Sequence, residues 1–160
     1  MPVVGIYLAS ASLLLVAGGQ KLADPSPLLR ALLSMRLHTP RGLVRVGAAF
    51  EVLLGLAALV LDSPWVALGV AGSYAAFTAF VVLGLARGGV LASCGCFGKA
   101  DVPPTRLHAV VTGSFALVAL SVAGLGASGD ARTVPLLVAA AAVSVTAYAV
   151  MAVLPLVQTR

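Results

Sequence analysis

The chain has two cysteines, and a single glycine separates them in the segment Ser93-Cys94-Gly95-Cys96. Two thiols at this spacing can close into a disulfide, exchange with a partner's disulfide, or bind one soft metal ion together. A disulfide needs Cα atoms about 4.4–6.8 Å apart, and an extended i, i+2 pair lies near the upper end of that range. We therefore expect a closed Cys94–Cys96 ring to be strained and easily reduced, as catalytic or regulatory disulfides are.

Three interpretations of the pair stay open. Thiol–disulfide exchange is favoured, because both cysteines of the chain cluster among glycines rather than lying singly in a helix. The alternative is a site for Cu(I) or another soft metal, with Cys94 and Cys96 as ligands. A structural zinc site needs four ligands, and Cys94, Cys96 and His108 supply three. The simplest interpretation is that both cysteines are buried apolar residues.

The neighbours of the cysteines fit exchange chemistry. Ser93 and Lys99 could favour a thiolate, and Phe97 would shield a mixed disulfide. Gly95 provides backbone freedom, and Gly98 completes the motif. The stretch is apolar but too short to cross a bilayer, so we expect a re-entrant or interfacial turn buried against other helices.

Glu51 is the second residue that could do chemistry, because it lies inside an otherwise apolar run. An ionisable group at membrane depth is costly and needs a partner, for which Lys21 and Arg45 are the candidates. A structural ion pair and a proton-handling role are equally compatible with this position. His38 and His108 fall near the ends of apolar runs, where we expect them to be solvated.

Aromatic residues Tyr74, Phe77 and Phe80 share another apolar run. We interpret them as packing residues, although aromatic rings facing Cys94 could accommodate a quinone. No phosphate loop, hydrolase triad or nucleotide motif is present, so if the protein is an enzyme we expect a thiol–disulfide oxidoreductase.

Composition assigns the chain to the lipid bilayer. It is 61% hydrophobic and 9% charged, whereas soluble domains carry about 25% charged residues. The net charge of +5 therefore indicates membrane topology rather than nucleic-acid binding.

Apolar runs of about 20 residues predict membrane helices, and five qualify. We expect one all-α membrane bundle over residues 1–160, with spans at about 3–19, 43–61, 65–86, 107–126 and 134–157. Residues 26–37 predict a short amphipathic helix in the interface, capped by Ser26 with Pro27 at its first position. Gly47 and Gly55 flank Glu51 as a small-residue packing stripe, and such faces also allow homo- or hetero-oligomers.

Basic residues predict the orientation. With five spans, all but one of the ten lysines and arginines fall on the side of the first loop, the third loop and the C-terminus. The positive-inside rule then places the N-terminus outside, and the C-terminus and the cysteine segment on the cytoplasmic side of a bacterial-type inner membrane.

Three motifs resemble the MauE-type branch of the DoxX-like integral membrane proteins. In chain order they are Gly19-Gln20-Lys21-Leu22 with Asp24-Pro25, then Phe50-Glu51-Val52-Leu53-Leu54-Gly55, and Ser93-Cys94-Gly95-Cys96-Phe97-Gly98. The resemblance covers roughly residues 5–110. It implies a membrane bundle that works with thioredoxin-fold partners in making or maintaining disulfides outside the cytoplasm. For this chain the resemblance implies that Cys94 and Cys96 are the redox pair. It also implies that Lys21 and Glu51 are motif residues, without an assigned role.

The predicted function is a membrane relay that passes electrons between Cys94–Cys96 and a thioredoxin-fold partner during maturation of exported proteins. Cytoplasmic thiols would not meet an extracytoplasmic partner directly. Reductant could cross the bundle from cytoplasmic thioredoxin, the site could open to the other side, or a quinone could intervene. The alternatives are a soft-metal or small-solute transporter and an accessory subunit of a larger membrane complex.

Overall fold

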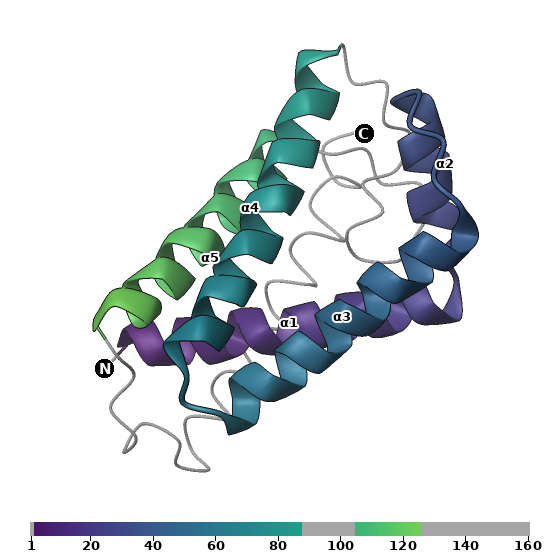
Figure 1. Cartoon of the computed structure of the whole chain (residues 1–160). Helices are drawn as coiled ribbons and strands as arrows, with labels where there is room; N and C mark the ends of the chain where they lie inside the picture. The colour runs from purple at the N-terminus through teal and green to yellow at the C-terminus, as the bar shows by residue number, and fades with distance from the viewer. Residues whose placement is uncertain (1, 88–104, 126–160) are drawn as a thin grey trace, which may run out of the picture.

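The computed structural model describes residues 2–87 and 105–125, and every regular element in these ranges is a helix (Figure 1). The elements are α1 (Pro2–Ala23), α2 (Ser26–Ser34), α3 (Arg41–Val60), α4 (Pro64–Ala86) and α5 (Arg106–Leu125). Within these ranges four helices, α1, α3, α4 and α5, are long and apolar enough to cross a membrane. This confirms the expected helical membrane bundle.

Helices α1 and α3 form a close antiparallel pair. A Cβ placed on Gly18 of α1 would lie 2.8 Å from the Ala48 carbonyl oxygen of α3. A Cβ placed on Gly55 of α3 would lie 2.9 Å from the Ala11 carbonyl oxygen of α1. Each helix therefore contributes a glycine that lets the two backbones meet, which is how helices associate where lipid provides no hydrophobic drive.

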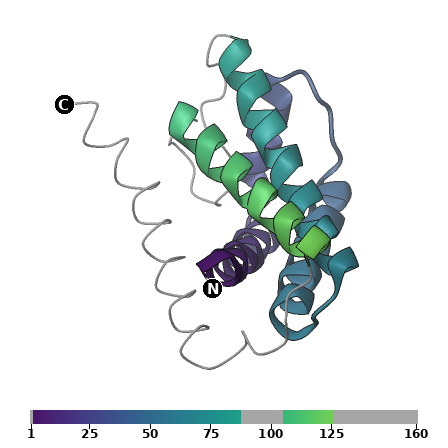
Figure 2. The same cartoon turned by 90° about the vertical axis from the view of Figure 1, so that its left-hand side faces the viewer.

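Helices α4 and α5 form the second antiparallel pair, side by side in both views (Figures 1 and 2). The Thr78 hydroxyl of α4 donates a hydrogen bond to the Thr112 hydroxyl of α5 at 2.8 Å. One turn away, fully buried Val81 packs against Ala109. A hydroxyl pair between membrane helices adds a directional contact to this apolar packing.

The α1–α3 pair crosses the α4–α5 pair, and the core lies where they meet (Figures 1 and 2). Tyr74 of α4 is the largest fully buried side chain there, at 1% exposure. Its ring packs edge-on against Phe115 of α5, with centroids 5.2 Å apart. Its hydroxyl donates to the Ser10 carbonyl oxygen of α1 at 2.7 Å. Tyr74 thus joins three helices with one side chain, since its ring packs while its hydroxyl is satisfied.

Helix α1 is longer than the sequence predicted. We expected it to end at Gly19, but it continues to Ala23. Neighbouring α3 covers this end, with Gly18 against the Glu51 Cβ, so tertiary packing compensates the low helix propensity of two successive glycines. The extension places Lys21 in the last helical turn.

Helix α2 is present, but its predicted cap is wrong. Pro25, not Ser26, is the N-cap residue, so Pro27 occupies the second helical position. The Ser26 N–H is satisfied from outside the helix, by the Asp24 carboxylate at 3.0 Å. Hydrogen bonds from Ser26 hold the pKa of exposed Asp24 below its usual value.

The predicted small-residue stripe of α3 is half right, and this gives a matched pair of variants. Gly55→Ala forces its Cβ against α1 backbone atoms at 2.9 Å, so we expect a loss of about 1–3 kcal/mol in unfolding free energy. Gly47 has nothing within 4 Å, so Gly47→Ala should be neutral or stabilise by up to about 1 kcal/mol. Denaturation in detergent measures both; equal destabilisation would contradict the packing.

Two predicted features lie outside the described residues. These are the fifth span at 134–157 and the re-entrant turn around the cysteines at 93–99.

Candidate functional site

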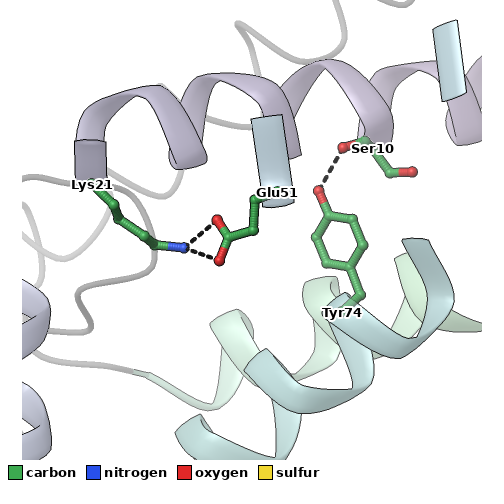
Figure 3. A network of polar contacts seen from close by, with 4 residues as sticks. All are labelled: Ser10, Lys21, Glu51 and Tyr74. Carbon is green, nitrogen blue, oxygen red and sulfur yellow. Dashed lines mark hydrogen bonds and ion pairs between the residues drawn. The ribbon is translucent and has the colours of Figure 1, made fainter. Parts of the chain in front are cut away.

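An ion pair lies between α1 and α3. The Lys21 Nζ donates to both oxygens of Glu51, at 2.9 Å and 2.6 Å (Figure 3). The two side chains are only 3% and 13% exposed. Of the two partners proposed for Glu51, the structure therefore selects Lys21; Arg45 is exposed.

Lys21 turns inward although its position would let it point to the membrane surface. It lies in the last turn of α1, where a lysine ordinarily extends its ammonium toward water. Glu51 lies near the middle of α3, and Gly18 makes room for the α3 backbone beside it. The inward geometry provides the charge partner that Glu51 needs at membrane depth.

Helix α4 closes the site from a third direction. The Lys21 Nζ lies 4.4 Å from the Phe77 ring centroid, a cation–π contact. Phe77 in turn packs edge-on against Tyr74, with ring centroids 5.8 Å apart. The Phe77 and Tyr74 rings therefore connect the ion pair to the Tyr74–Ser10 hydrogen bond. Figure 3 shows the ion pair and this hydrogen bond.

Gln20, next to Lys21 in the chain, has an unmet acceptor. Its side-chain Oε1 is buried and has no hydrogen-bond partner among residues 2–87 and 105–125. Buried polar atoms without partners are rare in native proteins and call for an explanation.

This arrangement acts as an electrostatic clamp between α1 and α3. A buried charge whose partner is removed costs about 3–5 kcal/mol, whereas the intact pair costs far less. The contacts alone account for a structural role. A proton-handling role for Glu51 remains a hypothesis.

A second polar cluster lies along the α4–α5 pair. His108 is buried at 4% exposure, so the expectation of a solvated histidine is wrong, whereas His38 is exposed as expected. The His108 Nδ1 accepts from the Thr105 N–H at 3.3 Å and contacts its hydroxyl at 2.9 Å. Thr112 donates back to the His108 carbonyl oxygen. The histidine thus holds the start of α5 rather than facing solvent.

The cysteine segment lies outside the described residues, but both of its flanks are described. Arg87, at the end of α4, donates from Nη1 to the Met35 carbonyl oxygen of the α2 cap at 3.3 Å. Thr105, before α5, is held by His108. Over residues 2–87 and 105–125, no three His, Cys, Asp or Glu side chains gather as a metal site.

The sequence did not reveal several residues of these clusters. Ser10 contributes a backbone carbonyl, which no side-chain pattern can reveal. The pairing of Thr78 with Thr112 depends on the register between two helices. One signal was available: threonines within apolar spans need partners, which an adjacent helix can provide.

Four long apolar helices in the described residues, with an ion pair buried between two of them, define a multi-pass α-helical membrane protein. The family model described as methylamine utilisation protein MauE matches residues 1–129. The chain belongs to this family. The match contains all described helices and both cysteines, and it extends beyond the expected 5–110. No curated protein and no solved structure matches the chain.

Proposed function

We propose that this protein is a membrane thiol–disulfide relay in which Cys94 and Cys96 exchange with a thioredoxin-fold partner during maturation of exported proteins. Membership of the MauE family, described as methylamine utilisation proteins, supports a role in methylamine utilisation. The thiol chemistry rests on the two cysteines, which the family match includes.

One structural observation carries the proposal: both flanks of the cysteine segment are anchored on the bundle. Arg87 is bonded to the end of α2 and Thr105 to His108. Helices α4 and α5 are themselves joined by Thr78 and Thr112. A redox segment between two fixed points meets its partner at a defined place on the membrane surface, which reduces the orientational cost of exchange.

The exchange needs no reactant other than the thiols of this protein and the disulfide of its partner. One Cys94–Cys96 thiolate attacks a sulfur of the partner disulfide and forms a mixed disulfide, releasing the partner's other sulfur as a thiolate. The second cysteine then attacks the mixed disulfide. The products are a Cys94–Cys96 disulfide and a partner dithiol, so two electrons pass to the partner. The reverse sequence oxidises the partner.

The proposed orientation places this end of the bundle in the cytoplasm. The basic residues Arg30, Arg36, Arg41, Arg45 and Arg87 gather around α2 and the adjoining helix ends, as the positive-inside rule requires of the cytoplasmic side. A membrane-impermeant maleimide added to right-side-out vesicles should then leave the reduced cysteines unlabelled. Labelling from outside would show that the orientation is the reverse of the proposed one, or that the site opens to the outer side of the membrane.

A redox titration of the purified protein tests the relay. Thiol trapping in defined glutathione or dithiothreitol buffers should show one two-electron transition between roughly −270 and −120 mV, the range of thioredoxin-like proteins. The same titration is run with a metal chelator. Thiols that stay blocked until the chelator is added would instead identify the soft-metal carrier, and thiols that are free but never oxidise as a pair would exclude the relay.

A further inference from the structure

Four exposed arginines surround the junction of α2 and α3. Arg30 lies on α2, Arg36 follows its C-cap residue, and Arg41 and Arg45 lie on the first turns of α3. The two helices are tied together here, because the Arg41 Nη2 donates to the Ser26 hydroxyl at 3.3 Å. We call this group of four residues the arginine corner.

The corner has one neighbouring carboxylate in the described part of the chain. Asp24 lies within electrostatic reach of Arg30 and Arg41 and accepts the Ser26 N–H. The next acid along the chain, Glu51, is committed to Lys21. The corner therefore keeps a net positive charge that the described residues do not neutralise.

Arg36 occupies a backbone position that glycine would fill without strain. Its φ of 61° is in the left-handed region. The Arg36 N–H bonds the Leu33 carbonyl and the Leu37 N–H bonds the Leu32 carbonyl, which is the Schellman termination that usually carries glycine. Non-glycine residues held in this region cluster at functional sites. Here the side chain adds a guanidinium to the corner.

The arginine corner lies at the membrane surface because of its position in the chain. Helix α2 connects α1 and α3, two helices that can span the bilayer, so it sits at their shared end (Figure 1). Its buried residues Ala31 and Met35 pack against Phe80 of α4. Arg30 of this helix is exposed. A basic side chain exposed at the end of the spanning helices lies within reach of the lipid headgroups.

We propose that the arginine corner binds the phosphate of an anionic phospholipid headgroup. A planar guanidinium matches phosphate geometry with two parallel hydrogen bonds. Clusters of four or more basic residues beside a membrane helix or on an amphipathic helix are typical of anionic-lipid recognition. A lipid is favoured over a soluble acidic protein because all four arginines lie on α2, just after it, or in the first two turns of α3, at the end of a helix that can span the bilayer. The bound lipid would seat α2, and through Met35 and Arg87 the end of α4.

Native mass spectrometry of the full chain in detergent tests this, with phosphatidylglycerol and phosphatidylcholine as probes. We expect the protein to prefer phosphatidylglycerol. Each arginine near the surface contributes about 1 kcal/mol, or about fivefold in affinity. Arg30→Gln with Arg41→Gln should therefore weaken binding at least tenfold, whereas Arg30→Lys with Arg41→Lys should retain most of it.

Arg36→Gly separates binding from folding. It relieves the backbone strain, so the thermal unfolding midpoint should stay or rise while phosphatidylglycerol affinity falls about fivefold. Arg106→Gln, at an exposed position on α5, is the matched control and should change affinity by less than twofold. Equal binding of both lipids, unchanged affinity in Arg36→Gly, an equal loss in Arg106→Gln, or displacement of the lipid by inorganic phosphate would each overturn the proposal.

Discussion

Replacing either Cys94 or Cys96 with serine is expected to abolish net transfer of electrons to the partner disulfide. Exchange needs one thiol to attack and a second to resolve the mixed disulfide. A serine hydroxyl does neither at neutral pH, so turnover should fall below detection rather than by a few fold. The measurement is the disulfide status of the partner, followed by thiol trapping.

The two single variants should differ in a way that assigns the roles. The variant that keeps the attacking cysteine should accumulate a covalent complex with the partner, visible on a non-reducing gel. The variant that keeps only the resolving cysteine should not, and the double variant serves as the blank. Normal partner disulfides in both single variants would refute the relay and favour the accessory-subunit hypothesis.

Breaking the Lys21–Glu51 pair on one side is expected to destabilise the bundle by about 3–5 kcal/mol. In Lys21→Met the Glu51 carboxylate loses its one described ion-pair partner while remaining 13% exposed between α1 and α3. In Glu51→Leu the ammonium keeps only the Phe77 ring at 4.4 Å. Thermal unfolding in detergent, followed by circular dichroism, measures both losses.

The double variant Lys21→Met with Glu51→Leu separates structure from function. Replacing both charges with apolar side chains of similar volume is often neutral, so stability should return to within about 1 kcal/mol of the native protein. If the pair is purely structural, the double variant also recovers exchange at Cys94 and Cys96. A stable double variant without exchange would show that Glu51 handles a proton or binds a partner. Failure of the double variant to recover stability would contradict a simple ion pair.

Hydropathy predicted the ends of the described membrane helices to within a few residues. The predicted 43–61, 65–86 and 107–126 compare with α3 (Arg41–Val60), α4 (Pro64–Ala86) and α5 (Arg106–Leu125). The largest error was the end of α1, which continues four residues past Gly19 to Ala23. Local propensity disfavours two glycines in a helix, and packing against Ala48 and Val52 of α3 overrides it.

For the site, the sequence singled out Glu51 as a buried acid and offered two partners. The choice of Lys21 over Arg45 depends on the antiparallel register of α1 and α3, which no pattern within one helix contains. His108 was misjudged for the same reason. Its place near the end of an apolar run predicted exposure to solvent, but the side chain is buried and its ring nitrogen contacts Thr105.

By itself, then, the sequence determined that this protein lies in a lipid bilayer and that it is helical. It also contains the family motifs and the two cysteines that could do thiol chemistry. These follow from composition and from spacing along one chain, because the bilayer requires each spanning segment to satisfy its own backbone. Only the tertiary structure decided which residues meet: Lys21 with Glu51 and Phe77, Tyr74 with Ser10, and Arg87 with the end of α2. Those contacts depend on close approach at Gly18 and Gly55 and on the crossing of two helix pairs, which a one-dimensional pattern does not encode.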